Sequence, residues 1–326
     1  MMLEVMNTLI LKAVLAPLVL FPVAAAVLVF GLLLKGVDRI VVARLQRRVG
    51  PPLLQPFFDI LKLMSKQSMV PIGAPRTLFL ALPMIGACSM CLAIALVPIV
   101  GVYEPNGQFG DLIVLLYLLT VPAIVLMLAG SASGSTFGAI GFSREMSLML
   151  AYEGPLLLVL ISVAMKTGLA QGDLITFSLM DIVHYQQDNG SFLFDPWMWP
   201  AVLAYLSIIP ANLGIPPFDI PEAESEVLEG PLCEYSGPAL ALFKIMSTMK
   251  TMVVLALGIV MFIPGNATGM MALIGFVFKC LILFLLTKSL LRASVGRMRI
   301  DQAFLFYFKW PELLGIVGLL LVVFKG

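Results

Sequence analysis

Residues Leu112–Gly130 read LIVLLYLLTVPAIVLMLAG, a run without a single charged side chain. A helix needs about 20 mostly apolar residues to cross the hydrocarbon core of a bilayer, and this run meets that requirement. Seven other stretches are similarly apolar: Ala13–Leu34, Leu78–Val100, Met146–Met165, Trp197–Ile215, Pro238–Ile263, Met270–Leu286 and about Phe304–Phe324, the last interrupted by Lys309 and Glu312. The sequence therefore predicts an all-α, polytopic membrane protein with about eight transmembrane helices.

The composition of the whole chain supports the same class. Of its 326 residues, 60% are hydrophobic and only 12% are charged. A soluble domain carries about a quarter charged residues, so this chain has about half of the usual solvating charge. The formal net charge is +1, which offers no basic surface for nucleic acid at the level of the whole chain. We expect one membrane domain over residues 1–326.

Histidine and cysteine are too few for several kinds of redox site. The only histidine is His184, and a haem held between two imidazoles needs two. The four cysteines are Cys88, Cys91, Cys233 and Cys280. The first two read C-x-x-C, but they lie in an apolar run and lack a second pair, whereas zinc and iron–sulfur sites need about four ligands. We expect the thiols of Cys88 and Cys91 to pack as small apolar groups and the chain to hold no cofactor or metal.

Lysine and arginine are concentrated in alternate loops between the predicted spans. They are Lys35, Arg39, Arg44, Arg47, Arg48, Lys62, Lys66 and Arg76, then Arg144, and finally Lys288, Arg292, Arg297, Arg299 and Lys309. The opposite loops carry almost only acids. By the positive-inside rule, the cytoplasmic loops are about 35–77, 131–145, 216–237 and 287–303, and both termini lie outside.

The first cytoplasmic loop is charged, yet apolar residues recur through it. This pattern predicts one or two amphipathic helices on the membrane surface, broken at Gly50-Pro51-Pro52. The helices could anchor the loop to lipid headgroups. Alternatively, the basic cluster at Arg44, Arg47 and Arg48 could dock a soluble partner. The residues alone leave both interpretations open.

The fifth loop is acidic throughout. Between Pro216 and Gly237 it contains Asp219, Glu222, Glu224, Glu226, Glu229 and Glu234, without a basic residue. An acidic run is usually a solvated segment, but this one is divided by turn-forming prolines and glycines. Carboxylates that are held close together share protons, because each negative charge raises the proton affinity of the others. The loop is therefore a candidate for proton handling or for partner docking.

Four ionisable residues lie inside predicted spans, namely Glu153, Lys244, Lys250 and Lys279. A rise of about 1.5 Å per residue puts Glu153, Lys250 and Lys279 near the membrane midplane, with Lys244 shallower. Glu145 is eight residues before Glu153, about 80° around a helix, so both can belong to one polar seam. Charges at this depth pair with each other and often mark an ion pathway, although a static pair between helices would also explain them.

Several of these segments together resemble one family. The acidic loop segments Pro217–Glu226 (PFDIPEAESE) and Glu234–Gly237 (EYSG) are similar to the corresponding loop of complex I subunit 1, which is the H subunit in bacteria. Arg44–Pro51 (RLQRRVGP) resembles its first cytoplasmic loop, together with Leu54-Gln55-Pro56, Asp59 and Lys62. Ser143-Arg144-Glu145 and Tyr152-Glu153 resemble its third loop and the helix that follows. The resemblance covers nearly the whole chain, and the expected eight helices agree with it.

Two departures favour one branch of this family. The segment Gly50–Pro56 is shorter than in respiratory complex I, and the helix after the acidic loop carries Lys244 and Lys250. Both features are similar to the homologous subunit of group 4 membrane-bound NiFe hydrogenases, the Ech, formate hydrogenlyase and archaeal membrane-bound types. The resemblance implies a membrane-anchor and coupling subunit that links ferredoxin- or formate-driven proton reduction to H⁺ or Na⁺ transport. The shortened loop argues against a quinone cavity.

The resemblance also implies partners and roles. The partners would be NiFe-hydrogenase-type large and small subunits and iron–sulfur subunits, which hold the NiFe centre and clusters, with antiporter-like membrane subunits alongside in a prokaryotic cell membrane. Expected docking residues are Arg39, Arg44, Arg47, Arg48, Asp59 and Lys62. Expected ion-pathway residues are Glu145, Glu153, Asp219, Glu222, Glu224, Glu226, Glu229, Glu234, Lys244, Lys250 and Lys279. The alternatives are the equivalent subunit of respiratory complex I and a stand-alone secondary transporter, although we find no internal repeat of the kind transporters show.

Overall fold

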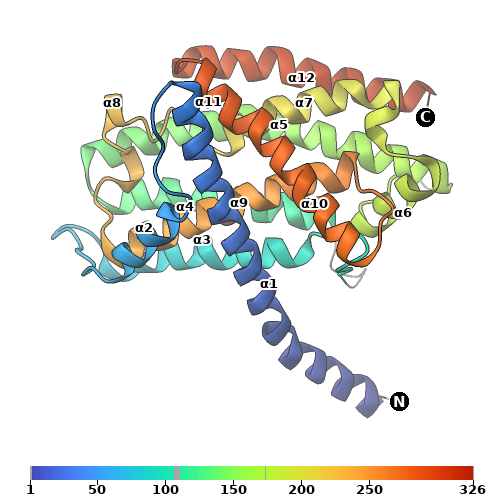
Figure 1. Cartoon of the computed structure of the whole chain (residues 1–326), viewed down its shortest axis with the longest axis horizontal. Helices are drawn as coiled ribbons and strands as arrows, with labels where there is room; N and C mark the ends of the chain where they lie inside the picture. Colours follow the sequence, from blue (N-terminus) through green and yellow to red (C-terminus); the bar gives the residue numbers. More distant parts are fainter. Residues whose placement is uncertain (1, 106–110, 173, 326) are drawn as a thin grey trace.

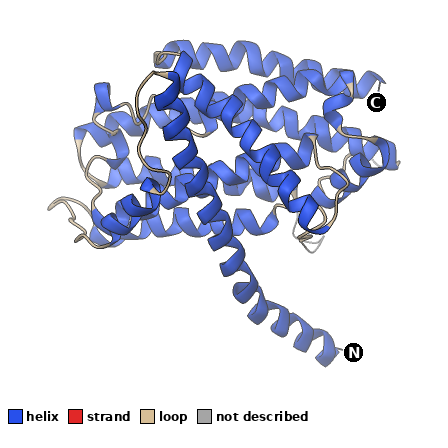
Figure 2. Cartoon of the chain, in the orientation of Figure 1, coloured by secondary structure: helices blue, strands red, loops and turns tan. Residues whose placement is uncertain are grey.

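The computed structural model describes residues 2–325 except 106–110 and 173, and it describes no side chains for residues 2–21, 224, 225 and 325. The described part is helical and contains no strand (Figure 2). Its α-helices are α1 (Met2–Leu45), α2 (Gln55–Met64), α3 (Arg76–Leu96), α4 (Leu112–Ala132), α5 (Thr136–Gln171), α6 (Leu179–Asn189), α7 (Trp199–Asn212), α8 (Glu224–Val227), α9 (Gly237–Phe262), α10 (Gly269–Phe284), α11 (Leu290–Ser294) and α12 (Ile300–Lys325). A π-helical turn, Leu285–Ser289, joins α10 to α11.

The predicted all-α, polytopic class is confirmed. Within the described residues, six helices are long and apolar enough to cross a membrane: α3, α4, α5, α9, the continuous segment Gly269–Ser294, and α12. The other two predicted spans fall on α1, which runs past Leu34 to Leu45, and on α7. Because α7 has only 14 residues, it is too short to cross a bilayer core by itself.

Helix α9 occupies the centre of the bundle. Most of its side chains are buried, from Ala239 to Phe262, and it packs against α1, α3 and α10. Helices α3, α4, α5, α7, α9 and α12 run side by side, whereas α1 and the α10–α11 segment cross them obliquely (Figure 1). A helix that is apolar on every side belongs in such a buried position. The lysines of α9 are therefore held inside the bundle or at its edges.

The four predicted cytoplasmic loops come together at one end of the bundle, on the left in Figure 1, where α2 and α8 also lie. Their bounds differ from the prediction. Helix α5 begins at Thr136, so most of segment 131–145 is helical, because Ser135 caps the helix by accepting a hydrogen bond from the backbone N–H of Gly138 at 3.0 Å. The first loop contains one helix, α2, after the expected break. Which end faces the cytoplasm stays a prediction.

Glycines let the acidic loop settle against the bundle. An added Cβ on Gly141 of α5 would come within 2.5 Å of Cδ of Pro231, and one on Gly130 of α4 within 3.4 Å of Cβ of Pro231. The absence of side chains at these two positions thus lets the loop pack closely against α4 and α5. Nearby, Tyr235 stacks on Phe79 of α3 with ring centroids 3.9 Å apart. The loop is packed against the transmembrane helices and is not a solvated segment.

Candidate functional site: a charged cavity under the acidic loop

A cavity of about 480 Å³ lies between α1, α5, α9, the α10–α11 segment and the acidic loop, residues 216–237. Its lining combines four carboxylates with six basic side chains: Glu145, Asp219, Glu222 and Glu229, with Lys35, Lys244, Lys250, Lys288, Arg292 and Arg297. These residues come from segments that are far apart in the sequence.

Two ion pairs hold the walls of this cavity together. Arg297 donates from Nη2 to Oδ2 of Asp219 at 2.9 Å, which fastens the acidic loop to the segment before α12. Arg292 of α11 donates to Asp38 of α1 at 3.0 Å, and the hydroxyl of Ser289 donates to the same carboxylate at 2.7 Å. Asp38 is only 2% exposed, so its charge needs both donors. The crossing helices α1 and α11 are therefore joined at the cavity.

The carboxylates of the acidic loop divide into two groups. Asp219, Glu222 and Glu229 line the cavity. Glu226 is not part of the lining and accepts a hydrogen bond from Nη1 of Arg144 at 2.5 Å, an ion pair that attaches α8 to α5. Glu234 is exposed. The side chain of Glu224 lies outside the described residues. The structure thus brings half of the predicted acidic set into the cavity.

Glu222 is a carboxylate of this loop with an altered proton affinity. Burial against the bundle raises its pKa from 4.5 to about 7, and the neighbouring carboxylates of Glu145 and Asp219 add to the rise. The charge of Lys35 acts in the opposite direction and offsets it in part, while Glu229 adds a smaller increase. A pKa near 7 means that Glu222 is partly protonated at neutral pH.

Two charged residues of the predicted seam meet in the wall of the cavity. Lys250 is 7% exposed and Glu145 is 9% exposed, and both line the cavity. The charge of Lys250 also interacts with those of Glu222 and Glu153. Glu153 itself is not part of the lining, and its Oε1 is buried without a hydrogen-bond partner among the described residues. Lys244, which precedes Lys250 on the same helix, is exposed toward the same cavity.

Lys279 does not join this group. Its Nζ donates to the backbone oxygens of Ile263 at 2.8 Å and Pro264 at 3.0 Å, just beyond the end of α9. These carbonyls come 13 and 14 positions after Lys250, roughly 20 Å away along the helix direction. A lysine that binds the free carbonyls at a helix C-terminus satisfies them and complements the helix dipole. Lys279 has a structural contact that the sequence interpretation did not anticipate.

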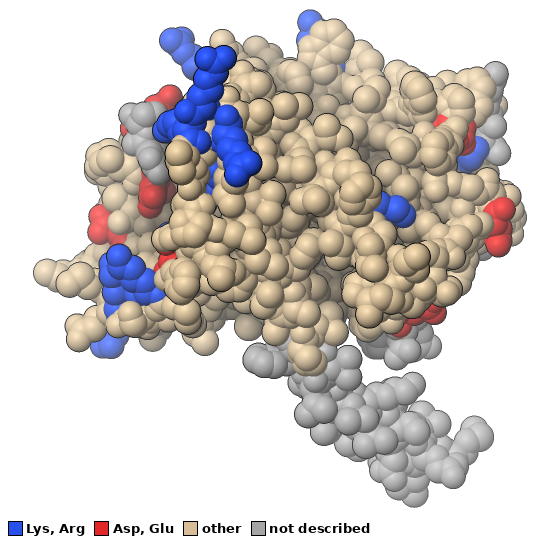
Figure 3. Space-filling view, viewed as in Figure 1, with Lys and Arg blue, Asp and Glu red and all other residues tan. Residues whose placement is uncertain are grey.

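The expected docking residues lie at the same end as the cavity. Arg44, Arg47 and Arg48 are exposed at the end of α1 and just after it, and basic side chains gather over this end of α1 and α11 (Figure 3). A hollow of about 280 Å³ beside them is lined by Arg39, Arg48 and Arg292. The three exposed arginines are free of carboxylate partners among the described side chains. Lys62 of α2 is also exposed.

Arg39 and Asp59 bind each other. Arg39 Nη1 donates to Asp59 at 2.8 Å, and Gln55 donates to the same carboxylate at 3.0 Å. Burial tends to raise the pKa of Asp59, but these two hydrogen bonds outweigh burial and lower the pKa below its usual value. This pair therefore fixes α2 against α1, and the exposed arginines and Lys62 are the members of the expected set that remain available to a partner.

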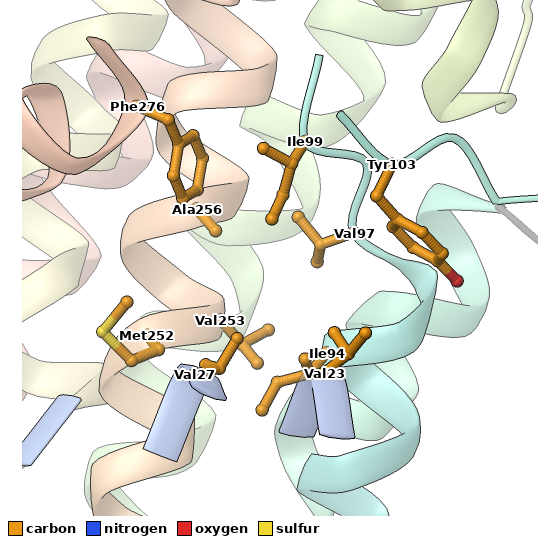
Figure 4. Close-up of a pocket in the computed structure, with 10 residues that line it drawn as sticks. All are labelled: Val23, Val27, Ile94, Val97, Ile99, Tyr103, Met252, Val253, Ala256 and Phe276. Carbon is orange, nitrogen blue, oxygen red and sulfur yellow. The ribbon is translucent and has the colours of Figure 1, made fainter. Parts of the chain in front are cut away.

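A third cavity and the two cysteines of the C-x-x-C pair show no comparable chemistry. A cavity of about 30 Å³, enough for one water molecule, lies between α1, α3, α9 and α10 and is lined by apolar side chains and Tyr103 (Figure 4). The Tyr103 hydroxyl donates to the backbone oxygen of Ala95 at 2.8 Å. Cys91 lies 3.8 Å from the sulfur of Met249, and Cys88 is exposed. In the described residues, no three His, Cys, Asp or Glu side chains are placed to hold a metal.

Sequence interpretation missed four basic residues of the cavity, Lys35, Lys288, Arg292 and Arg297, and the buried Asp38. All were visible as charges at the cytoplasmic ends of predicted spans. The four basic residues indicated only the orientation of the chain, because the sequence does not tell which helix ends converge.

Comparison with known proteins shows which family the chain belongs to. The family described as NADH dehydrogenase matches residues 18–323. The chain belongs to the NADH dehydrogenase family. This confirms the predicted resemblance to complex I subunit 1 and its relatives. The charged cavity and the acidic loop both lie within the matched residues.

Three proteins show how the chain relates to the rest of the family. Formate hydrogenlyase subunit 4 of Escherichia coli (strain K12) is 35% identical over 294 residues, which cover 87% of this chain and 92% of that protein. The H subunit of NADH-quinone oxidoreductase from Dehalococcoides mccartyi (strain ATCC BAA-2266 / KCTC 15142 / 195) is 30% identical over 310 residues, covering 92% and 83%. A chain of the membrane-bound sulfane sulfur reductase, an archaeal respiratory membrane complex, has a TM-score of 0.84 and 29% identity, covering 93% and 99%.

Proposed function

We propose that this chain is the membrane-anchor and coupling subunit of an ion-translocating, membrane-bound NiFe-hydrogenase complex. The observation that carries the proposal is the cavity of about 480 Å³ whose lining combines carboxylates of the acidic loop with six basic side chains, at the same end of the bundle as the exposed arginines Arg44, Arg47 and Arg48. Similarity to formate hydrogenlyase subunit 4 over most of both chains supports the hydrogenase branch. The complex would couple proton reduction, driven by ferredoxin or formate, to movement of H⁺ or Na⁺.

In this function, Arg44, Arg47 and Arg48 would bind the peripheral arm. The arm would contain the large and small hydrogenase subunits and iron–sulfur subunits, and this chain would hold no redox centre itself. A change of charge in the arm would act on the acidic loop, which lies at the same end of the bundle (Figure 1). The cavity would pass that change to Lys250 and on to Glu153, from which antiporter-like subunits would receive it.

The lining of the cavity favours this function over quinone reduction. A quinone has an apolar tail, and sites for such ligands are lined mostly by apolar and aromatic side chains with few polar groups. Here ten of the 24 lining residues are charged, which is more than the few polar groups of such sites, although apolar residues share the lining. The shortened Gly50–Pro56 segment agrees with this interpretation. An assembly that reduces a quinone, as the name of the Dehalococcoides mccartyi relative indicates for that protein, is the second candidate.

Sulfane sulfur reduction is a further candidate, because the solved relative with a TM-score of 0.84 belongs to a complex with that name. A stand-alone secondary transporter fits less well. The two sequence relatives are named as subunits, and the solved relative is part of a respiratory complex. The exposed arginine cluster would also have no role in a transporter that acts alone.

Purification of the chain from its native membrane in mild detergent separates these candidates. We expect soluble and membrane subunits to co-purify, nickel to be present, and hydrogen to form from a reduced low-potential donor without added quinone. Turnover that requires a quinone would establish the second candidate. Nickel-free complexes that reduce sulfane sulfur would establish the third, and a chain that purifies alone would refute the coupling function altogether.

Charge reversal at the arginine cluster tests the docking step. Arg47→Glu with Arg48→Glu should release hydrogenase activity from the membrane into the soluble fraction, because exposed charge pairs across an interface turn from attraction to repulsion. Arg76→Glu, at the start of α3 and also exposed, is the matched control and should leave the arm bound. Retention of the arm by the double variant through a high-salt wash would exclude this docking site.

A further inference from the structure

Glu312 is an ionisable residue within a membrane-spanning helix, and it does not line the charged cavity. It follows Ile300, the first residue of α12, by twelve positions, roughly 18 Å along a helix roughly 39 Å long. That depth is close to the middle of the span. Its side chain is partly exposed. An ionised carboxylate in contact with lipid tails is costly, so residues of this kind pair with another group.

The carboxylate lies over a glycine of the neighbouring helix α5. A Cβ added to Gly154 would be 4.0 Å from Oε1 of Glu312, and Gly154 is itself exposed. The two residues therefore form a small notch on the outer surface, where α5 and α12 pack together along their length. Gly154 is exposed and Glu312 is partly exposed, so a charge partner for Glu312 can approach this notch from outside the chain.

Within the described residues, Glu312 has no hydrogen bond or ion pair. The basic side chain nearest along α12 is Lys309, which is three residues earlier and thus on the same side of the helix. Its Nζ lies 5.5 Å from the ring centroid of Trp310. It forms no ion pair with Glu312 in the structure. The helix thus leaves its mid-span carboxylate without a charge partner.

The surface around the notch is apolar. Leu150 and Leu157 on α5 are 57% and 43% exposed, and Leu313 and Ile316 on α12 are 51% and 44% exposed. Leu150 and Leu157 are spaced by four and three residues from Gly154, so they lie on one stripe with it. A glycine on an apolar stripe permits close approach of another transmembrane helix, which is how such helices associate in lipid.

We infer that the α5–α12 face binds a transmembrane helix of a neighbouring membrane subunit, and that this helix presents a lysine or arginine to Glu312. Lipid tails would cover the leucines equally well but would leave the carboxylate unpaired. A helix with a basic residue satisfies both the apolar stripe and the charge. The inference rests on the proposed function in one respect, that the chain works as one subunit of a membrane complex.

Site-specific photocross-linking in the intact complex tests this contact. A photoreactive amino acid at position 313, replacing Leu313, should cross-link to one membrane subunit. Glu312→Gln in the same background should lower the cross-linked fraction about tenfold or more, as loss of one partner of a buried charge pair does. Lys309→Gln is the matched control and should leave the cross-link unchanged, because Lys309 is not the partner.

Each outcome decides the question. An intact complex without a cross-link at position 313 refutes this inference alone, whereas a chain that purifies without other subunits refutes the proposed function. Equal losses in the Lys309 and Glu312 variants would show an internal pair and also refute the inference. If Glu312→Gln fails to accumulate, Glu312→Lys combined with Glu at the partner's basic position should restore both the cross-link and the yield, and failure of this exchange would overturn the contact.

Discussion

Replacement of Glu222 by glutamine tests whether the acidic loop binds a proton near neutral pH. Burial, with the nearby carboxylates of Glu145 and Asp219, raises the pKa of Glu222 to about 7. The ordinary pKa of a glutamate, which applies to the solvated side chain of an unfolded chain, is 4.5. The native state therefore binds more protons than the unfolded state between these two values. Glutamine keeps the shape of the protonated side chain and cannot ionise.

The sign and size of the effect follow from linkage. Where the native state binds more protons, stability falls as pH rises. For Glu222 this loss begins near pH 4.5 and is complete once the pH exceeds about 7. One pH unit corresponds to about 1.4 kcal/mol, so a rise of the pKa from 4.5 to about 7 gives a loss of at most about 3 kcal/mol. The measured loss should be smaller, because part of the side chain faces the cavity.

Thermal unfolding of the purified complex at about pH 5 and about pH 8, on either side of this window, measures the difference. The wild type should lose stability between the two, and Glu222→Gln should lose less and be the more stable protein at the higher pH. Glu234→Gln is the matched control, because Glu234 belongs to the same loop but is exposed. A Glu222→Gln protein with the wild-type pH dependence would refute the assignment of this proton to Glu222.

Two further predictions concern the packing around the site. Lys279→Met should lower the free energy of unfolding by about 1–2 kcal/mol, because its hydrogen bonds to the end of α9 are lost, and should leave ion transport by the assembled complex intact. Loss of transport at normal yield would instead support a role of Lys279 in the ion path. Gly141→Ala should lower the free energy of unfolding by about 1–3 kcal/mol, because the added Cβ would lie 2.5 Å from Cδ of Pro231. Gly275→Ala, which has open space around it, is the control and should be neutral or slightly stabilising. Equal effects of the two substitutions in thermal unfolding would contradict the close packing of the loop on α5.

The fold could be predicted to a large extent because an apolar run of sufficient length forms a membrane-spanning helix largely independently of the rest of the chain. The run from Leu112 was expected to form a helix and does so, as α4. The bounds were less predictable, since a helix can continue into water once its caps and packing allow it. Helix α1 passes Leu34 and reaches Leu45, and α5 begins at Thr136, ten residues before the predicted start of its span at Met146.

The site was predictable only where its residues share a segment. The acidic loop stood out because its carboxylates are close in sequence, and Asp219, Glu222 and Glu229 do line the cavity. Lys35 and Arg297 belong to the same cavity because α1 crosses the bundle there and the last loop lies beside it. These tertiary positions cannot be predicted from the residues next to Lys35 and Arg297 in the sequence. Depth alone does not show which group Lys279 contacts: its long side chain reaches the carbonyls after α9, and its place in an ion path stays a prediction.

The charge balance of the cavity gives the proposed coupling a physical basis. Its lining contains four acidic and six basic residues, and the buried Asp38 offsets Arg292 from outside the lining. When every group is ionised the set is positive by one charge, and a proton on Glu222 makes the excess two. An added negative charge in a docked arm would favour that proton, because Glu222 already has a pKa of about 7 and small fields change its occupancy most there. The loop would then take up a proton on reduction of the arm and release it on reoxidation.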